Sequence, residues 1–543
     1  GSLNDYNYSG DDIASWTFRK APKFFDVVTW TGDGSTRNIS HNLDSAPGMI
    51  IIKRLDSAAG WVVYHRSVGA TKYLRLDTTN AENTYSVYFN DTAPTSSVFT
   101  VGANGDVNGN GNTYVAYLFA HNNSDGTFGP NYDQDIIKCG TFNSGGSAVD
   151  VDVNLGFEPQ FVMFKLSSTA GGWYMYDTMR GIVTGGNDAL LFANASSAET
   201  VTGDYIDVTS TGFKLTAAGW NGVSGPNHDL IYMAIRRGPL TPPTAGTEVF
   251  AVHKETSATL NQTPPFLQPA PFAVDFISNK FFGGASSWWS ATRLTGARLQ
   301  FNQSNAETSV STSHEFDHND GVAVNGLSGS TNFMGYMWKR APSFFDAVAY
   351  TGNGTTTTIP HNLQVVPELI INKVRNNSGT WRVHHAAFGY DYEIYLDGTA
   401  AMQGPGYGGN WGGANPTATH LAVSGGTNTN TYTFISYLFA TLAGVSKVGS
   451  YTGDGVNGKV IDCGFTSGAR FVLGKRTDSA SDWYLFDSVR GITISNDPYL
   501  ALNLSDAEAT IDNIIRPDSS GFALGNAGHL NQSGGSFIFY AIA

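Results

Sequence analysis

The sequence predicts an all-β protein built from tandem, jelly-roll-like β-sandwich units of about 100 residues each. Three observations support this prediction. Charged residues make up only 14% of the 543-residue chain, while Gly (63), Phe (33) and Tyr (25) are abundant, and such residues suit strands and the turns between them. The chain also repeats itself, and each repeat contains short strands of alternating polarity.

The clearest repeat has an offset of 320 residues. Residues 24–43 read FFDVVTWTGDGSTRNISHNL, and residues 344–363 read FFDAVAYTGNGTTTTIPHNL, without a gap. The match continues to His65 and His385. A fixed period of this kind is the signature of a repeat architecture.

A shorter period of five units lies inside the long one. Each unit has an apolar strand that commonly ends in Lys, a following Trp, and a closing aromatic strand, and four units carry an Ala-Glu pair. The recurring tryptophans are identified as Trp61, Trp173, Trp289, Trp381 and Trp483. The predicted spans are 24–121 (unit 1), 136–238 (unit 2), 247–342 (unit 3, divergent), 343–441 (unit 4, a copy of unit 1) and 445–543 (unit 5, a copy of unit 2).

Residues 1–23 are expected to be the terminal strand of a truncated preceding unit. The string IASWTFRKAP at 13–22 matches FMGYMWKRAP at 333–342, which closes unit 3. Within the units, TGDG at 31–34 predicts a hairpin turn, because Asp-Gly supplies positive φ. The recurring Trp is expected to plug the core of its own sandwich, and the Pro-rich stretch 261–271 is expected to be a loop.

Bulk charge and apolar content exclude several classes of partner. The net charge is −14 without clustered Lys or Arg, which argues against nucleic-acid binding. No apolar run approaches the roughly 20 residues that a membrane span needs, so membrane insertion is not expected. Cys139 and Cys463 occupy non-equivalent places in their units, which predicts two buried thiols rather than a disulfide.

Two motif matches are rejected as catalytic sites. His314 to His318 form an HExxH pattern, but their surroundings are strand-like and turn-rich, and on a strand residues i and i+4 lie roughly 13 Å apart. Residues 453–459 have the spacing of a phosphate loop, but Val460 stands where Ser or Thr is needed, and this segment is the repeat turn, predicted to be a hairpin. The sequence therefore nominates no catalytic residue, and the protein is not expected to be an enzyme.

One polar turn and the paired histidines offer weaker candidates. Asp106, Asn108 and Asn110 imitate the start of a calcium loop, but the twelfth position is Tyr117 rather than Glu. They are kept as weak candidate Ca²⁺ ligands beside the plainer interpretation of a polar turn, and no other cofactor is expected. The histidines that recur across the repeat are interpreted as structural hydrogen-bonding groups.

The candidate ligand-binding residues are aromatics at which one unit differs from the others. These are Trp288 in unit 3, and Tyr407 and Trp411 in the Gly-rich loop QGPGYGGNWGGAN of unit 4. Exposed rings among glycines suit stacking on a sugar face. The alternative is that they pack against their own sandwich or a neighbouring chain.

The repeat strings resemble modules of tail-fibre and other virion appendage proteins of tailed bacteriophages. The first form is TGNGTTTTIPHNLQVVPELIINKVRNNSGTWRVHH at 351–385, with a second copy at 31–65, and the partner form is GGWYMYDTMRGI at 171–182 and SDWYLFDSVRGI at 481–492. The resemblance implies a virion structural protein on the particle exterior, extracellular and homo-oligomeric, with a trimer as the expected state. Its partners would be other virion proteins and a host-surface glycan or protein.

Four functions remain open at this point. The first is a tail fibre or exterior appendage that mediates host-surface attachment, where stacked units give reach and avidity. The second is a capsid-decorating or connector protein with a role in assembly and stability alone. A polysaccharide-degrading tailspike and a bacterial surface adhesin are less favoured.

Overall fold

The structure is almost entirely β-sheet, which confirms the predicted fold class. Short helical turns occur at η2 (Gly246–Glu248), η3 (Gly408–Asn410), η4 (Gly425–Thr427) and α2 (Gly528–Asn531). Among the residues described, no helix is long and apolar enough to cross a membrane. This structure, a computed structural model, describes residues 12–125, 127–146, 149–217, 227–256, 266–309, 314–324, 332–404, 406 and 408–543.

Units 1 and 4 share one strand plan. In both, the first strand pairs with the last, and the last also pairs with the strand that holds the apolar run. Unit 1 comprises β1 (Phe25–Thr31), β2 (Arg37–Ser40), β3 (Met49–Arg54), β4 (Val62–His65), β5 (Lys72–Arg75), β6 (Asn83–Thr84), β7 (Val98–Val101) and β8 (Thr113–Phe119). Unit 4 comprises β26 (Phe345–Thr351), β27 (Thr357–Pro360), β28 (Leu369–Val374), β29 (Arg382–His385), β30 (Ile394–Tyr395), β31 (His420–Val423) and β32 (Thr433–Phe439).

Units 2 and 5 repeat this plan with a three-stranded second sheet. Unit 2 comprises β9 (Ile137–Asn143), β10 (Val151–Asn154), β11 (Pro159–Leu166), β12 (Trp173–Asp177), β13 (Leu191–Phe192), β14 (Ile206–Thr209), β15 (Gly212–Leu215) and β16 (Asp229–Arg236). Unit 5 comprises β33 (Ser446–Thr452), β34 (Lys459–Asp462), β35 (Phe471–Arg476), β36 (Trp483–Asp487), β37 (Asp497–Ala501), β38 (Ala509–Ile511), β39 (Ile515–Asp518), β40 (Gly521–Leu524) and β41 (Ser536–Ile542).

Unit 3 keeps the plan despite its divergent sequence. Part of its Pro-rich stretch forms β18 rather than a loop, which corrects the prediction for that stretch. Pro269 can end this strand because β18 lies at the edge of its sheet, where a missing N–H breaks no ladder. The unit comprises β17 (Phe250–Thr256), β18 (Phe266–Pro269), β19 (Phe276–Phe281), β20 (Trp289–Thr292), β21 (Ala297–Gln300), β22 (Thr308–Ser309), β23 (His314–Glu315), β24 (Gly321–Val324) and β25 (Asn332–Trp338).

The conserved Gly-rich turn joins the two sheets of a unit and is not a hairpin. Gly34, Gly354 and Gly455 have φ between 72° and 76°, so the predicted positive φ is present. However, β1 pairs with β8 while β2 pairs with β7, and β33 and β34 likewise lie in different sheets. The hairpin prediction is therefore wrong, because a turn of this conformation can also carry a chain between sheets.

The central strand of each unit is apolar on both faces, as β32 shows. Phe434 and Leu438 pack inside unit 4. The alternating residues Ile435, Tyr437 and Phe439 belong instead to a cluster that also contains residues of units 2, 3 and 5. A strand buried on both faces reads as a continuous apolar run, and this explains the aromatic strand that closes each unit.

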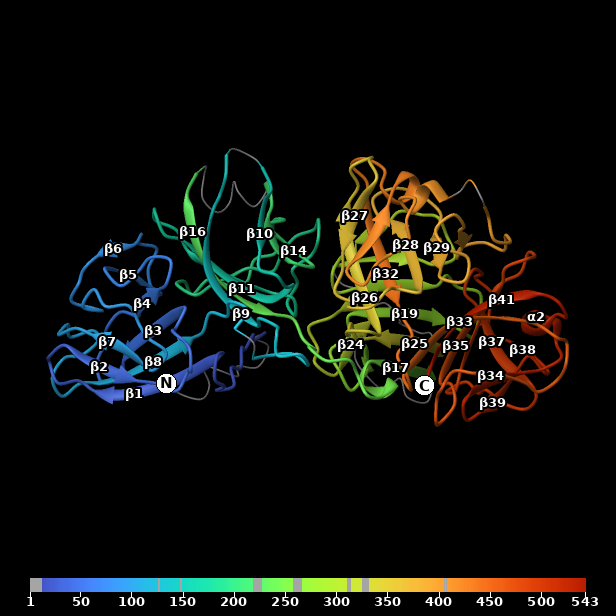
Figure 1. Ribbon diagram of the computed structural model, residues 1–543, viewed down its shortest axis with the longest axis horizontal. Helices are drawn as coiled ribbons and strands as arrows, with labels where there is room; N and C mark the ends of the chain where they lie inside the picture. The colour runs from blue at the N-terminus through green and yellow to red at the C-terminus, as the bar shows by residue number, and fades with distance from the viewer. Residues whose placement is uncertain are drawn as a thin grey trace.

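Units 3, 4 and 5 surround a common apolar centre, and we call this group the closed module (Figure 1, right half). Phe276 of unit 3 lies 4.6 Å from Tyr437 of unit 4 between ring centroids, and Phe439 of unit 4 lies 4.9 Å from Tyr540 of unit 5. Phe471 of unit 5 completes the circuit at 5.3 Å from Phe250 of unit 3. A small apolar cavity of ≈ 40 Å³ lies between the three units.

Units 1 and 2 pack on each other in the other half of the molecule, and we call them, with residues 12–22, the open module (Figure 1, left half). Residues 12–20 form no strand, although the sequence predicts one there. The reason is that this segment has no neighbouring strand with which to form a ladder among the described residues. Ala21 makes only an isolated bridge to Phe25.

Candidate functional site

A Lys–Trp pair recurs in all five units, and its position defines how the units join. The Lys ammonium lies 5.4–5.9 Å from the Trp ring centroid in every unit, a distance at which cation–π attraction operates. The pairs are Lys53–Trp61, Lys165–Trp173, Lys280–Trp288, Lys373–Trp381 and Lys475–Trp483.

Trp288, not Trp289, is therefore the recurring tryptophan of unit 3. Its backbone N–H donates to Asn302, as that of Trp173 donates to Asn194. Trp289 is partly exposed, with its ring 4.1 Å from the Arg298 guanidinium. The prediction of Trp289 is therefore wrong. The signal that it missed is the spacing, since Trp288 follows Lys280 by eight residues, as each of the other four tryptophans follows its lysine.

The indole N–H groups link the three units of the closed module in a cycle. Each donates to a backbone carbonyl of the next unit, and each ring is at most 2% exposed. The three bonds run from Trp288 to Ala501 (2.9 Å), from Trp381 to Gln300 (2.8 Å) and from Trp483 to Tyr395 (2.8 Å). The expectation that these rings plug their own sandwiches is wrong, since each ring fills the boundary between two units.

Two of the three paired lysines of the closed module, Lys373 and Lys475, also bond a neighbouring unit. Lys373 donates to Gly379 of its own unit at 2.6 Å and to Ser304 of unit 3 at 2.9 Å. Burial lowers the pKa of this Lys373 ammonium to about 8. Buried cations need such partners, so the ammonium contributes to the join between the units.

Of the three indole N–H bonds between units that the closed module contains, the open module has the counterpart of one. Trp173 of unit 2 donates its indole N–H to the Arg75 carbonyl of unit 1 at 2.8 Å. Trp61 of unit 1 is instead partly exposed, and Lys53 donates to the Ala59 carbonyl of its own loop. Unit 1 thus carries the residues of a join without the neighbouring unit among the described residues.

Three of the four Ala-Glu pairs also lie at joins between units. The backbone N–H of Glu82 donates to Ser167 of unit 2, that of Glu307 to Arg375 of unit 4, and that of Glu508 to Phe282 of unit 3. Each bond crosses a boundary between units. The sequence pattern shows that these pairs recur but does not indicate this role. A residue recurs from unit to unit whether it holds a turn or contacts the neighbouring unit.

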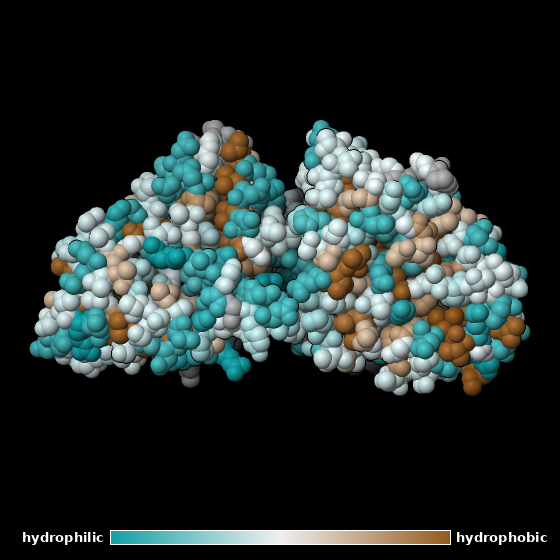
Figure 2. All heavy atoms as spheres, in the orientation of Figure 1, coloured by the Kyte–Doolittle hydropathy of each residue, from teal (hydrophilic) through white to brown (hydrophobic). Residues whose placement is uncertain are grey.

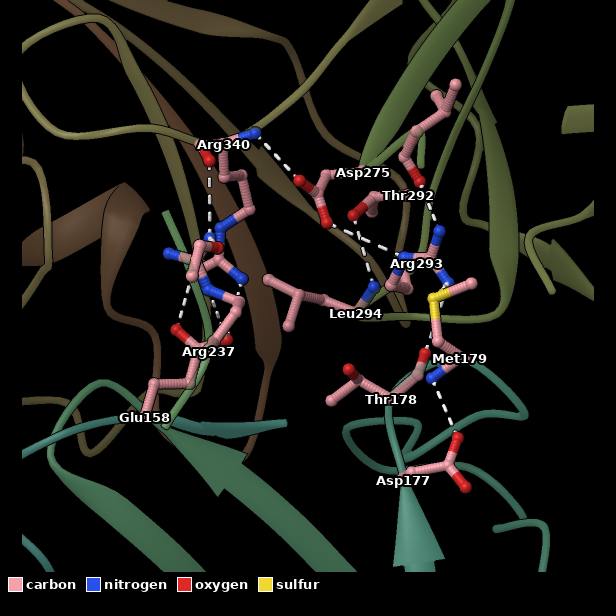
Figure 3. Close-up of polar contacts among 12 residues, drawn as sticks. Glu158, Asp177, Thr178, Met179, Arg237, Asp275, Thr292, Arg293, Leu294 and Arg340 are labelled. Carbon is pink, nitrogen blue, oxygen red and sulfur yellow. Dashed lines mark hydrogen bonds and ion pairs between the residues drawn. The ribbon is translucent and has the colours of Figure 1, made fainter. Parts of the chain in front are cut away.

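A buried ion network joins the two modules (Figure 3). Arg340 of unit 3 binds both carboxylate oxygens of Glu158 of unit 2, at 2.7 and 2.6 Å, and also Asp346 of unit 4 at 2.7 Å. Burial alone would lower the pKa of Arg340, but the adjacent carboxylates outweigh it and raise the pKa above the usual value. A fork of donors held between two carboxylates fixes orientation as well as distance.

Arg293 makes a second contact between the modules. Its guanidinium donates to the Thr178 carbonyl of unit 2 at 3.3 Å and to the Val274 carbonyl of its own unit at 2.7 Å (Figure 3). Arg375 of unit 4 likewise donates to the Thr184 carbonyl of unit 2 at 3.0 Å, so three buried guanidinium groups hold unit 2 to units 3 and 4.

Above this network lies a cleft between units 2 and 4, of ≈ 460 Å³, visible as the notch between the halves in Figure 2. Glu158 and Arg340 line its floor, and polar residues such as Asn154 and Thr211 line its wall. The rest of the face in Figure 2 is largely hydrophilic or neutral, with apolar residues in small scattered groups. The lining of the cleft is mixed, since apolar residues such as Val208 and Ile359 also line it.

The recurring histidines serve as structural hydrogen-bonding groups, as predicted. His41 and His361 each accept the backbone N–H two residues on, at 3.2 and 3.3 Å. His65 bonds the Tyr232 carbonyl of unit 2 at 3.1 Å, which adds to the join between units 1 and 2. Burial lowers the pKa of His65 and of His385 to about 4.

The predicted ligand-binding aromatics lack the exposure on which that prediction rested. Trp288 is fully buried and Trp411 is 2% exposed, packed in the core of unit 4. Tyr407 lies outside the described residues. Trp411 ends in the core because its Gly-rich loop folds back on its own sandwich, near His384.

The candidate calcium ligands are occupied by protein partners. Asp106 accepts a hydrogen bond from Arg75 at 2.7 Å, and the buried Asn108 amide donates to Asp33 and to the Ser35 carbonyl. Asn110 is exposed. The equivalent residue Asn428 forms the same hydrogen bonds in the turn of unit 4. The Asn108 side chain therefore has a structural role in the turn that involves no metal ion.

The histidines of the HExxH pattern fall into different surroundings. His314 is buried and hydrogen-bonded to Asn279 at 3.2 Å. His318 instead lies with Glu315 and Asp317, whose ligand atoms all fall within 4.8 Å of one another. This small group is partly exposed, and exposed acidic groups occur commonly without an ion.

The fold and the joins define a class of protein: a tandem array of β-sandwiches that pack on one another through recurring Trp, Lys and Ala-Glu contacts. The chain belongs to the family described as "Domain of unknown function (DUF7483)", whose model matches residues 2–239 and 298–543. No curated protein and no solved structure matches the chain. The second match includes β21 to β25 of unit 3 together with units 4 and 5.

Proposed function

We propose that the protein is a non-enzymatic structural protein of a bacteriophage virion exterior, a tail fibre or other appendage that attaches to a host surface. The observation that carries this proposal is the cycle of three indole N–H bonds around one apolar centre. In this cycle the most strongly recurring side chains join one unit to the next, as a rigid spacer requires. The resemblance of the repeat strings to tail-fibre modules supports the same assignment.

The cleft between units 2 and 4 is the surface we assign to host contact. Its wall carries amide and hydroxyl groups that can hydrogen-bond a glycan or a polar protein loop, and its floor is fixed by the Glu158–Arg340 pair. A site that is held rigid before binding loses less entropy when the ligand arrives.

Two measurements test the proposal. Particles that carry the protein are reconstructed by electron cryo-microscopy, and density for these sandwiches on the tail or its fibres is the expected result. Density confined to the capsid would favour the capsid-decorating alternative, in which the same joins serve assembly alone. Purified chain is also tested for binding to host cells, where Thr211→Arg, which fills the cleft from an exposed position, should reduce binding while Val456→Arg on exposed unit 5 surface should not.

The expected homo-oligomer stays a prediction. Sedimentation equilibrium of the purified chain measures it directly, and a single species of one chain mass would contradict it.

A further inference from the structure

The open module repeats the closed module with one unit fewer. Trp61 of unit 1 corresponds to Trp381 of unit 4, which is fully buried against unit 3. Tyr117 and its equivalent Tyr437 differ in the same way, since Tyr117 is partly exposed and Tyr437 is only 1% exposed. In the closed module, unit 3 covers these positions.

The edge of unit 2 is uncovered in the same way. In unit 5 the backbone N–H of Glu508 donates to Phe282 of unit 3. The corresponding Glu199 of unit 2 is exposed. Both flanks on which unit 3 sits in the closed module are therefore present, and uncovered, in the open module.

Residues 12–20 lie in the open module where β25 lies in the closed one. Trp16 donates its indole N–H to Asp177 of unit 2 at 3.1 Å, and Tyr336 of β25 donates its hydroxyl to the equivalent Asp487 of unit 5 at 2.8 Å. The bridge from Ala21 to Phe25 likewise has its copy 320 residues on. This segment therefore has the placement of the last strand of a unit.

The strand position is occupied but unpaired. β25 is a central strand, paired with β17 on one side and β19 on the other. Residues 12–20 have no such ladder among the described residues, and apart from the inward-facing Trp16 and Phe18 they are exposed. A central strand without its neighbours presents two rows of unpaired backbone groups, which is a template for further strands.

We infer that the uncovered face of units 1 and 2 is the binding surface for a third β-sandwich unit of the unit 3 type, with residues 12–20 as its final strand. The seated unit would accept the Trp61 indole N–H on a backbone carbonyl, as Gln300 accepts that of Trp381. It would also donate an indole N–H to the β13 edge of unit 2, as Trp288 donates to Ala501. The assembly module of this protein is then a ring of three units, present once complete and once as two units and a strand.

The test compares two thiol probes at equivalent positions. Leu76 is partly exposed, whereas Leu396, its equivalent, is fully buried in the centre of the closed module. The native thiols Cys139 and Cys463 are buried, so a maleimide reports on Leu76→Cys or Leu396→Cys alone. In a chain with no unit added or removed, Leu76→Cys should react at least about tenfold faster than Leu396→Cys, because labelling of a buried thiol requires local opening.

A third unit is then supplied by replacing residues 1–11 with a second copy of residues 240–331. The expected result is that labelling of Leu76→Cys slows to the rate of Leu396→Cys, and that backbone amides of residues 13–18 become protected from hydrogen exchange. Unchanged labelling and unprotected amides would overturn the inference.

A reciprocal variant removes residues 240–331 from their native place. Leu396→Cys should then react as fast as Leu76→Cys does in the unaltered chain, and continued protection of Leu396→Cys would contradict the assignment of that face to a unit 3 type partner. Sedimentation of the chain with no unit added or removed tests whether a second copy of the chain covers this face instead. A dimer in which Leu76→Cys is protected would show that it does, and would also overturn the inference.

Discussion

The closed and the open module use nearly the same residues in different surroundings. In the closed module Trp381 and Lys373 are buried and bonded to unit 3, while in the open module Trp61 is partly exposed and Lys53 bonds within its own loop. The difference shows that these residues encode contacts between units, not the stability of a single sandwich. Matched substitutions in the two modules should therefore have unequal effects.

The largest difference is expected between Trp381→Ala and Trp61→Ala. Removing a fully buried Trp costs about 3–5 kcal/mol, and Trp381 also forms a hydrogen bond between units. Trp61→Ala should cost less than about 1 kcal/mol, as for surface positions. Urea unfolding followed by hydrogen exchange measures the stability of each module separately. Trp173→Ala is the control and should behave like Trp381→Ala. Equal losses of unfolding free energy in Trp61→Ala and Trp381→Ala would refute the comparison.

Arg340→Ala should also destabilise the junction by about 3–5 kcal/mol, because it removes the guanidinium that bonds both buried carboxylates. Arg237 alone then remains beside them, at 3.2 Å from Glu158 and 3.8 Å from Asp346. The counterpart of Arg340 is Lys20, which contacts Asp26 at 2.6 Å but is 58% exposed. Lys20→Ala should therefore cost no more than about 1 kcal/mol. Both values come from urea midpoints at pH 7, and a small loss for Arg340→Ala would mean that the network does not hold the modules together.

Acid should weaken both modules alike, through His65 and His385. Burial holds the pKa of each imidazole at about 4 in the folded chain, against roughly 6.5 when unfolded. The unfolded state therefore binds more protons below pH 6.5, so stability falls as pH decreases from 6.5 to 4, by about 2 kcal/mol per imidazole between pH 7 and 5. The pH dependence of unfolding should flatten equally in His65→Gln and His385→Gln, and an effect in one variant alone would contradict the equal burial effect on the two imidazoles.

Calcium should have the smallest effect. The Asp106 carboxylate is paired with Arg75, and the equivalent position in unit 4 is Gly426. Adding Ca²⁺ or a chelator should leave the thermal midpoint of either module unchanged, since only a ligand that binds the folded state shifts it. A rise confined to the open module and lost in Asp106→Asn would instead establish a calcium site in unit 1.

The all-β fold class and the small helix content follow from the sequence because they depend on local patterns of period two and on turn residues. The packing of Trp288 and Trp381 between units could not be predicted in this way, because an apolar ring has the same pattern whether it fills a sandwich core or a boundary. The sheet-to-sheet turn at Gly34 was predicted as a hairpin because both turns require the same positive φ. The Glu158–Arg340 pair links residues 182 positions apart, and no short-range signal marks it.

Hydrogen exchange of two segments in the unaltered chain tests the central claim most directly. Amides of residues 333–338 in β25 should be among the most protected of the protein, because ladders flank this strand on both sides. Amides of the matching residues 13–18 should exchange orders of magnitude faster. Equal protection of the two segments would contradict the distinction between a complete and an incomplete ring of units.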